Sequence, residues 1–479
     1  MVELINDEEN HVRLCSPKSP VRFAALTYCW GSTPQPSTTT SNVLARYSGL
    51  DPSTLPQTLQ DAVTATRALG LNYLWVDSLC ILQNDPGDWS REASKMADIY
   101  SSAHVVLAAA FPEDCAQGFL HPRPVPLAIK SGTVEKSRFE VHARRNRTHD
   151  CWHRSHKDDS AIFKRAWCMQ ERFLARRILY FMQDEIQFQC QEQRFCECNA
   201  SHKLYVDSAK AENIIRINGP HILGANECFM LLQAKKPLGT SFPMSFGLVW
   251  GGVVQEYSQL SLTYSEDMLP ALSGIAHDVL QHHPGKYLAG LWERDLAIQL
   301  GWQSFNSTAK DVEARAERIM KAGPSFSWIS WRGSVDFWDD IGIDPDDLVP
   351  ICALESSDIK LATADPYGQV LAGSSICIKG YVADISQAVL EMKDSDISLD
   401  DGSTYPRPSE ASGSSVIILG LYEYVTFSQD WDCSGLEVVK GLVLQHKEHG
   451  PELARIGVVR KVLASQFYAV AREGSFTIV

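Results

Sequence analysis

The sequence has no run that approaches the ~20 consecutive apolar residues needed to span a bilayer. Its opening residues, Met1 to Glu9, are acidic and hold no apolar core of the kind found in secretory leaders, so we expect no leader. Basic charge is also scarce: 44 Lys and Arg stand against 58 Asp and Glu, for a net charge of −14. That balance argues against a general nucleic-acid binder, because neutralising phosphates needs a basic surface. We predict a cytoplasmic protein with no membrane span and no nucleic-acid partner.

The number and spacing of the cysteines do not indicate a disulfide framework. There are 13 of them, an odd number, and some lie within apolar runs, which is typical of reduced thiols in the cytosol or nucleus. Two groups of Cys and His have looser spacing than the usual Cys-x₂₋₄-Cys pairs of zinc sites, so we predict no metal site. These groups are Cys190, Cys196, Cys198 and His202, and Cys151, His153 and His156.

At 479 residues the chain is too long for a single hydrophobic core. Changes in composition predict an N-terminal extension over 1–20, an α/β domain over 21–200, a helical extension over 201–340 and a β-rich module over 341–479. The helical pattern runs from 265 to 320 and includes Met268–Leu280 and Tyr287–Leu300.

The last part is typical of an antiparallel β module, because Gly, Asp and Ser clusters separate short β-branched runs. The runs are Ser375–Val382, Ser415–Leu421, Gly441–Leu444, Ala454–Val459 and Phe467–Val470. The polar stretch Asp394–Ser415 predicts a disordered insertion.

Residues 21–200 alternate between strand and helix patterns. Strands are expected over 21–31, Tyr73–Val76 and His104–Ala110, with a helix over Leu59–Leu69 and another from Pro86 with Asp85 as N-cap. A helix over Phe163–Arg176 and strands over Arg177–Phe181 and Glu185–Cys190 follow. Short connections between such elements predict an α/β fold with a doubly wound parallel sheet.

Two of these strands end in polar or reactive residues. The first ends at Trp30-Gly31, and the second is followed by Asp77 and Cys80. Because ligands of open α/β sheets bind at the carboxyl ends of the strands, both ends point to one candidate site. The stretch Ser32–Ser41, rich in Ser, Thr and Pro, predicts a mobile loop beside it.

Five motifs, in this order and spacing, resemble the fungal heterokaryon incompatibility (HET) domain family. They are Ala25-Leu-Thr-Tyr-Cys-Trp-Gly31, Leu55-Pro-Gln-Thr-Leu-Gln-Asp61-Ala, Tyr73-Leu-Trp-Val-Asp-Ser-Leu-Cys-Ile-Leu-Gln83, Asp88-Trp with Glu92, Met96 and Ile99-Tyr100, and Arg165-Ala-Trp-Cys-Met-Gln-Glu-Arg172 with Arg177-Ile-Leu-Tyr-Phe181. Three later stretches look like an extension common in longer members: Asp267–Ala276, Tyr287-Leu-Ala-Gly-Leu-Trp292 and Pro324-Ser-Phe-Ser-Trp328. Thr27, Cys29 and Ser78 depart from the commoner family residues without weakening the fold assignment.

The resemblance implies a filamentous-fungal protein that acts in non-self recognition or cell-death signalling. It also implies a TIR-like, flavodoxin-like α/β sheet, with other proteins of the same pathway or a second copy of the chain as partners. No array of ligand-binding repeats follows the domain, which modestly favours a stand-alone activity over a sensor.

Asp77 and Cys80 are candidate catalytic residues, since a thiolate beside an acid and a base can act as a nucleophile. His121, in the loop after the third strand, is the better-placed base, because His104 opens that strand at the opposite edge. The structural alternative makes Cys80 a small buried hydrophobe. Asp77 would then cap the following turn or bond the Trp30-Gly31 loop, with Gln83 in the same arrangement.

Glu92 and Glu171 are candidates for a TIR-like hydrolase with NAD as substrate, where one carboxylate stabilises an oxocarbenium-like transition state. No glycine-rich phosphate loop supports that chemistry, and we expect no resident cofactor. Glu92 alternatively supplies a favourable charge near a helix N-terminus, and Glu171 a salt bridge to Arg172 or another basic side chain.

A further group offers stacking faces or close backbone approach to a small-molecule ligand. Its members are Tyr28, Trp30, Gly31, Gln83, His121, Trp167 and Gln170. The alternative places Trp30 in the core beside a tight turn and packs the Trp167 face of its helix on the sheet. The basic stretch 144–157 is interpreted as a solvated loop, with binding of an anion or partner as the alternative.

The leading hypothesis is therefore a HET-domain protein that signals by interaction. The rival hypothesis is an enzyme, which either cleaves NAD through Glu92 or Glu171 or transforms a small molecule of a fungal biosynthetic pathway with Cys80 and Asp77.

Overall fold

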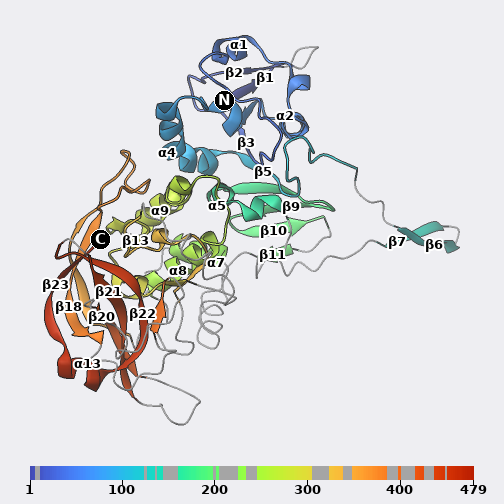
Figure 1. The fold of residues 1–479 in the computed structure, drawn as a ribbon. Helices are drawn as coiled ribbons and strands as arrows, with labels where there is room; N and C mark the ends of the chain where they lie inside the picture. Colours follow the sequence, from blue (N-terminus) through green and yellow to red (C-terminus); the bar gives the residue numbers. More distant parts are fainter. Residues whose placement is uncertain are drawn as a thin grey trace. The chain divides into compact units, whose positions relative to one another are not determined.

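The protein is described by a computed structural model, shown in Figure 1. It describes residues 1–5, 11–122, 127–134, 137–143, 160–197, 201–203, 225–233, 245–304, 323–337, 348–385, 397–400, 416–425, 436–447 and 450–479. The chain forms two compact units, Met1–Tyr205 and Val206–Val479, and the finer division into four parts stays a prediction. Among the described residues, no helix is long and apolar enough to cross a membrane.

The first unit is built on a nine-stranded sheet with a parallel centre and antiparallel edges. The centre runs in the order β4 (Tyr73–Trp75), β3 (Ala24–Thr27), β5 (Val105–Ala109) and β8 (Arg177–Phe181). One edge adds β1 (Val2–Leu4) and β2 (Val12–Leu14), and the other adds β9 (Ile186–Cys190), β10 (Gln193–Cys196) and β11 (Ser201–Lys203). The prediction of an α/β fold with parallel strands is confirmed at the centre of the sheet, whereas the strands at both edges are antiparallel. The connections from β8 to β9 and from β9 to β10 are hairpin turns, which are too short for the crossover that parallel strands need.

The first unit contains the two helices predicted over Leu59–Leu69 and from Pro86, as α2 and α4, together with short helices that the sequence did not predict. Its helices are α1 (Val43–Ser48), η1 (Pro52–Thr54), α2 (Gln57–Ala68), α3 (Asp77–Cys80), α4 (Pro86–Ser102), η3 (Ala161–Lys164) and α5 (Ala166–Phe173). The cap of α4 is confirmed, since the Asp85 carboxylate accepts hydrogen bonds from the N–H groups of Gly87 and Asp88. The helix expected over Phe163–Arg176 is interrupted, because Arg165 has an extended backbone between η3 and α5.

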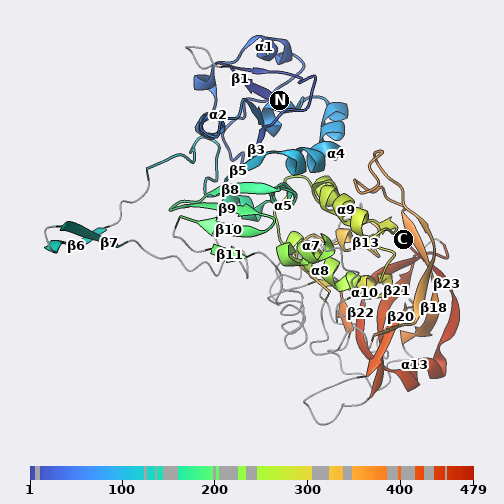
Figure 2. The same ribbon diagram turned by 180° about the vertical axis from the view of Figure 1, so that it is seen from behind.

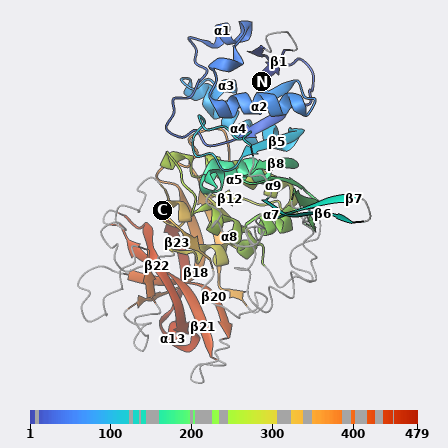
Figure 3. The same cartoon turned by 90° about the vertical axis from the view of Figure 1, so that its right-hand side faces the viewer.

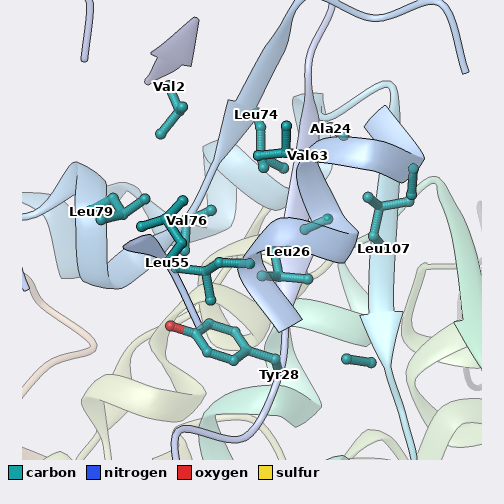
Figure 4. Packing of buried hydrophobic residues seen from close by; sticks show 14 of the residues in the cluster. Val2, Ala24, Leu26, Tyr28, Leu55, Val63, Leu74, Val76, Leu79 and Leu107 are labelled. Carbon is teal, nitrogen blue, oxygen red and sulfur yellow. The ribbon is translucent and has the colours of Figure 1, made fainter. Parts of the chain in front are cut away.

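The core of the first unit lies between the sheet and α2, which packs Leu59, Ala62 and Val63 against the strands (Figure 3). Figure 4 shows Leu26, Leu74 and other strand side chains meeting this face. A separate two-stranded hairpin, β6 (Leu127–Val134) and β7 (Ser137–Ala143), completes the unit.

The second unit begins with helices and short strands. The helices are α7 (Ala225–Gln233), α8 (Phe246–Tyr257), η5 (Ser265–Asp267), α9 (Pro270–His282), α10 (Leu296–Leu300) and η6 (Trp328–Ser330). The short strands are β12 (Tyr287–Leu288) with β13 (Leu291–Trp292), and β14 (Gln303–Ser304) with β15 (Val335–Asp336). The helix predicted over Met268–Leu280 is confirmed as α9, whereas residues 305–320 lie outside the described part.

The helix predicted over Tyr287–Leu300 is wrong for its first half, which forms the hairpin β12–β13. Ala289 and Gly290 form its turn with φ of 54° and 96°, the left-handed values that suit a two-residue hairpin loop. The Gly290 carbonyl accepts hydrogen bonds from the indole N–H groups of Trp250 and Trp328, both at 2.9 Å. These partners come from distant segments, so the apolar periodicity of the sequence could not reveal the turn.

The C-terminal part is an eight-stranded, mainly antiparallel sheet. Its strands are β16 (Val349–Pro350), β17 (Cys352–Asp358), β18 (Ser375–Asp384), β19 (Ile397–Leu399), β20 (Val416–Val425), β21 (Glu437–His446), β22 (Leu453–Leu463) and β23 (Arg472–Ile478). Strands β18, β20, β21, β22 and β23 pair in a closed ring, seen from behind in Figure 2. The predicted β module is thereby confirmed.

Two local predictions in this module are wrong. Phe467–Val470 lies in the helix α13 (Ala464–Val470), whose buried Ala464 and Phe467 stand one helical turn apart. Ile397 and Leu399, within the expected disordered insertion, are buried and pair with β22. The remainder of that insertion, 394–396 and 401–415, lies outside the described residues.

Candidate functional site

The ends of β3 and β4 are joined by the two motif residues Trp30 and Asp77. The Trp30 indole N–H donates to Asp77 Oδ2 at 2.9 Å, and the Ser78 N–H donates to Asp77 Oδ1 at 2.7 Å. Both Trp30 and Asp77 are half-buried. Asp77 is therefore hydrogen-bonded to the Trp30-Gly31 loop, as predicted by the structural alternative to a catalytic role for Asp77. Gln83 belongs to the same arrangement, since its Nε2 donates to the Asp77 carbonyl at 3.1 Å.

The loop after β3 makes hydrogen bonds at several points along its length, and the mobility expected for Ser32–Ser41 stays a prediction. The Tyr28 hydroxyl donates to Gln35 Oε1 at 3.1 Å and lies 3.0 Å from Ser78 Oγ, within hydrogen-bond distance. Farther along, the Thr38 N–H donates to the Ser78 carbonyl at 2.9 Å. Tyr28 is buried under this loop, which explains its place at the strand end.

Gly31 makes the turn that starts this loop. Its φ is +73°, and it brings the N–H groups of Ser32 and Thr33 within 2.8 and 2.9 Å of Asp114 Oδ2. The Thr33 hydroxyl, the Ala116 N–H and these two N–H groups hold the pKa of Asp114 well below its usual range. A Cβ atom on Gly31 would lie 2.3 Å from that same oxygen. Gly31 is thus required by close approach of the loop to Asp114.

Two ionisable residues of one motif lie near the strand ends: Arg165, which is half-buried, and Glu171, which is buried. Arg165 precedes α5 and donates from Nη1 to the Tyr28 carbonyl at 3.1 Å. Glu171, on α5, is 6% exposed, and burial raises its pKa to about 7, while Thr27 and Arg165 oppose the rise and the charge of Asp77 adds to it. Burial also raises the pKa of Asp77, against the hydrogen bonds from Ser78 and Trp30. The positive charge of Arg165 therefore acts on two carboxyl groups, those of Asp77 and Glu171, at a site with little access to water.

Arg165 is the residue that the sequence interpretation missed. Its signal was present, because it opens the motif that contains Trp167, Gln170 and Glu171. Tyr100, also missed, contributes from α4: its hydroxyl donates to the Leu26 carbonyl at 2.9 Å and lies beside Glu171.

The structure separates Glu92 from Glu171. Glu92 lies on α4 and pairs with Lys95 one turn along the same helix, at 2.8 Å. Glu171 instead interacts with Asp77 and Arg165 at the strand ends. Of the two candidate glutamates, only Glu171 belongs to this cluster.

Cys80 and His121 lie at different places along the edge. The Cys80 Sγ accepts a hydrogen bond from the Val76 N–H at 3.4 Å, and burial raises the pKa of its thiol. His121 contacts the ring of Phe111 and lies 3.0 Å from the Gln183 carbonyl, beyond β5 and β8. Since β3 and β5 lie between β4 and β8, the fold does not supply His121 as a base for Cys80.

The remaining candidates pack among other groups. Trp167 makes an edge-to-face contact with Trp89, with ring centroids 6.0 Å apart, and Gln170 is fully buried. Among the described residues there is no group of three or more metal-ligating side chains. The stretch 144–157, with Cys151, His153 and His156, and also Cys198, lie outside those residues. Cys196 is disulfide-bonded, which corrects the expectation of reduced thiols for this residue, although the other described cysteines are free.

Replacing Gly31 should destabilise the first unit more than replacing Gly70. Gly31→Ala combines a left-handed φ with the clash against Asp114, whereas Gly70, with φ of +70°, has nothing within 4 Å of an added Cβ. We expect Gly70→Ala to lower the free energy of unfolding by about 1 kcal/mol and Gly31→Ala by roughly 3 kcal/mol or more. Urea unfolding of both variants measures the difference, and equal losses would contradict the Asp114 contact.

The raised pKa of Glu171 should make the free energy of unfolding fall as pH rises. Its pKa is 4.5 as a free side chain and about 7 in the fold, so the folded state holds the proton more tightly. Glu171 therefore contributes fully to the free energy of unfolding below pH 4.5. This contribution, on the order of 3 kcal/mol, is lost as pH rises through 7. Glu171→Gln should remove this loss, so the stability difference between wild type and variant should change with pH over that window. Glu92→Gln is the matched control, and a difference that is constant from pH 4.5 to 8 would refute the assignment.

Residues 23–171 match the family model described as Heterokaryon incompatibility protein (HET). That range contains Trp30, Gly31, Asp77, Arg165 and Glu171, which together form the strand-end cluster. No curated protein and no solved structure matches the chain. The match confirms the predicted resemblance: residues 23–171 of this chain are similar to the heterokaryon incompatibility (HET) domain family.

Proposed function

We propose that this is a heterokaryon-incompatibility-type protein of a filamentous fungus that acts in non-self recognition or cell-death signalling. Its HET domain, over residues 23–171, would be the signalling part, built as a TIR-like α/β domain. The observation that carries the proposal is that the family motifs meet in one hydrogen-bonded cluster at the strand ends.

The way in which motif side chains are used supports signalling by interaction. Besides the Trp30–Asp77 bond, the Asp61 carboxylate accepts hydrogen bonds from the N–H groups of Phe119 and Leu120 at 2.6 and 2.8 Å. Gln57 Nε2 holds the other Asp61 oxygen at 2.8 Å. Such bonds, made to charged acceptors, fix the loops at the strand ends. A rigid edge of this kind suits recognition by another protein of the pathway or by a second copy of the chain.

Induced expression of the full chain in a filamentous fungus tests this proposal. We expect loss of viability on induction, measured by colony counts and vital-dye uptake. Trp30→Phe keeps the ring but removes the N–H that Asp77 accepts, so it should restore growth. Trp89→Phe keeps an aromatic ring against Trp167 and leaves the Trp30–Asp77 bond intact, so it is the matched control and should remain lethal. Normal growth while soluble wild-type protein accumulates would refute the proposal.

A second candidate function is NAD cleavage, and the Glu171 environment favours it specifically. An ionised carboxylate at a strand end can accept hydrogen bonds from ribose hydroxyls and stabilise the positive charge that develops as the glycosidic bond breaks. Nicotinamide would leave with the bonding electrons, and water would add to the sugar to give ADP-ribose. The Cys80 route has less support, because a raised thiol pKa disfavours the thiolate.

Nicotinamide release from NAD by the purified full chain tests this second candidate. The ionised form of Glu171 is the active one, so the rate should rise with pH through about 7. Glu171→Gln should lower the rate by about a hundredfold or more, whereas Glu92→Gln should leave it within about twofold, since Glu92 only pairs along its own helix. Equal losses in the two variants, or no release by wild type at high protein concentration, would exclude NAD cleavage through Glu171.

A further inference from the structure

The second unit contains a pocket of about 530 Å³, within the range of small-molecule sites. It lies where the turn between β21 and β22 meets the segment around Trp331 and the loop at Ala372. Its lining residues lie outside residues 23–171, which match the family model, and include Pro324 and Ser325 of the Pro324-Ser-Phe-Ser-Trp328 stretch.

A buried ion pair forms one wall of this pocket. Arg455 donates to both oxygens of Asp400, at 2.9 and 3.0 Å, and also to the carbonyls of Leu300 and Trp302. Its guanidinium lies 3.5 Å from the Trp302 ring centroid, and the side chain has no exposed surface. Arg455 and Asp400 therefore neutralise each other and shape the wall, without a charge left for a ligand.

The accessible surface has two chemical parts. Apolar wall atoms come from Leu399, Ala454 and Ile456. At the mouth stand two exposed ammonium groups: Lys447 lines the pocket, and Lys360 Nζ would lie 3.1 Å from a Cβ placed on the lining residue Gly373. Within the part of the chain that the structure describes, neither lysine has an ion-pair partner.

We propose that this pocket binds a small organic anion, whose apolar body rests on Leu399, Ala454 and Ile456 and whose acidic group lies between Lys360 and Lys447. The chain as a whole carries a net charge of −14, so general attraction of anions does not account for binding here. The two lysines supply the local positive potential, and the neutral Arg455–Asp400 wall avoids repelling the acidic group.

The fluorescent sulfonate 1-anilinonaphthalene-8-sulfonate, titrated into the folded full chain, is the probe for this site. Its uncharged analogue N-phenyl-1-naphthylamine has the same rings without the acid. Lys360→Glu/Lys447→Glu tests the charge, and Ala372→Trp fills the pocket from its exposed mouth. Lys461→Glu, an exposed lysine of β22 outside the pocket, is the matched control.

We expect one saturable sulfonate site per chain. The double lysine variant should weaken sulfonate binding by about tenfold or more, with the neutral analogue changed by less than about twofold, and Lys461→Glu should have no effect. Ala372→Trp should weaken both probes. The proposal is overturned if wild type shows no saturable sulfonate binding, if Ala372→Trp binds as wild type does, or if Lys461→Glu is as harmful as the double variant.

Discussion

The first unit depends on the hydrogen bond between the Trp30 indole and the Asp77 carboxylate. Asp77 leaves β4 where water is largely excluded, so its charge must be met by donors from the protein. Trp30 and Ser78 provide them. This bond holds the end of β3 against the end of β4 and sets the direction of the chain into Gly31. From there the loop reaches Asp114 after β5, so three strand ends are joined through two carboxylates.

Two carboxyl groups, those of Asp77 and Glu171, interact electrostatically with the single guanidinium of Arg165. Burying charges costs free energy unless each is well paired, and one Arg165 cannot fully neutralise both acids. Burial therefore raises the pKa of each carboxyl in spite of the nearby guanidinium. A carboxyl that titrates near neutral pH is common at functional sites, but it also arises in structural networks. The cluster is therefore compatible with signalling through a rigid edge and with catalysis by Glu171.

The second unit uses side chains in a comparable way to hold irregular backbone. Gln299 is fully buried and bonds both the N–H and the carbonyl of Trp292, at 2.9 and 3.0 Å. Together with the two indoles on Gly290, it fixes the β12–β13 hairpin and its left-handed turn. Arg455 links β22 to the end of α10 and the residues that follow it, because its guanidinium donates to the carbonyls of Leu300 and Trp302. Buried polar groups satisfied in this manner specify one backbone arrangement.

The sequence by itself determined the central strands, the Asp85 cap of α4 and the closeness of Trp30 to Asp77, because these depend on local periodicity and on strand direction. The resemblance of residues 23–171 to the HET family came from five motifs, and the family model matches there. Only the tertiary structure decided the antiparallel edges, the hairpin at Tyr287–Trp292, the helix α13 and the division between Glu171 and Glu92. The hairpin and the placing of Glu171 depend on partners far along the chain: Trp250 and Trp328 for the hairpin, and Tyr100 and Asp77 for Glu171. Periodicity reports which face of an element is buried, and it carries no information on which distant side chain satisfies a buried polar group.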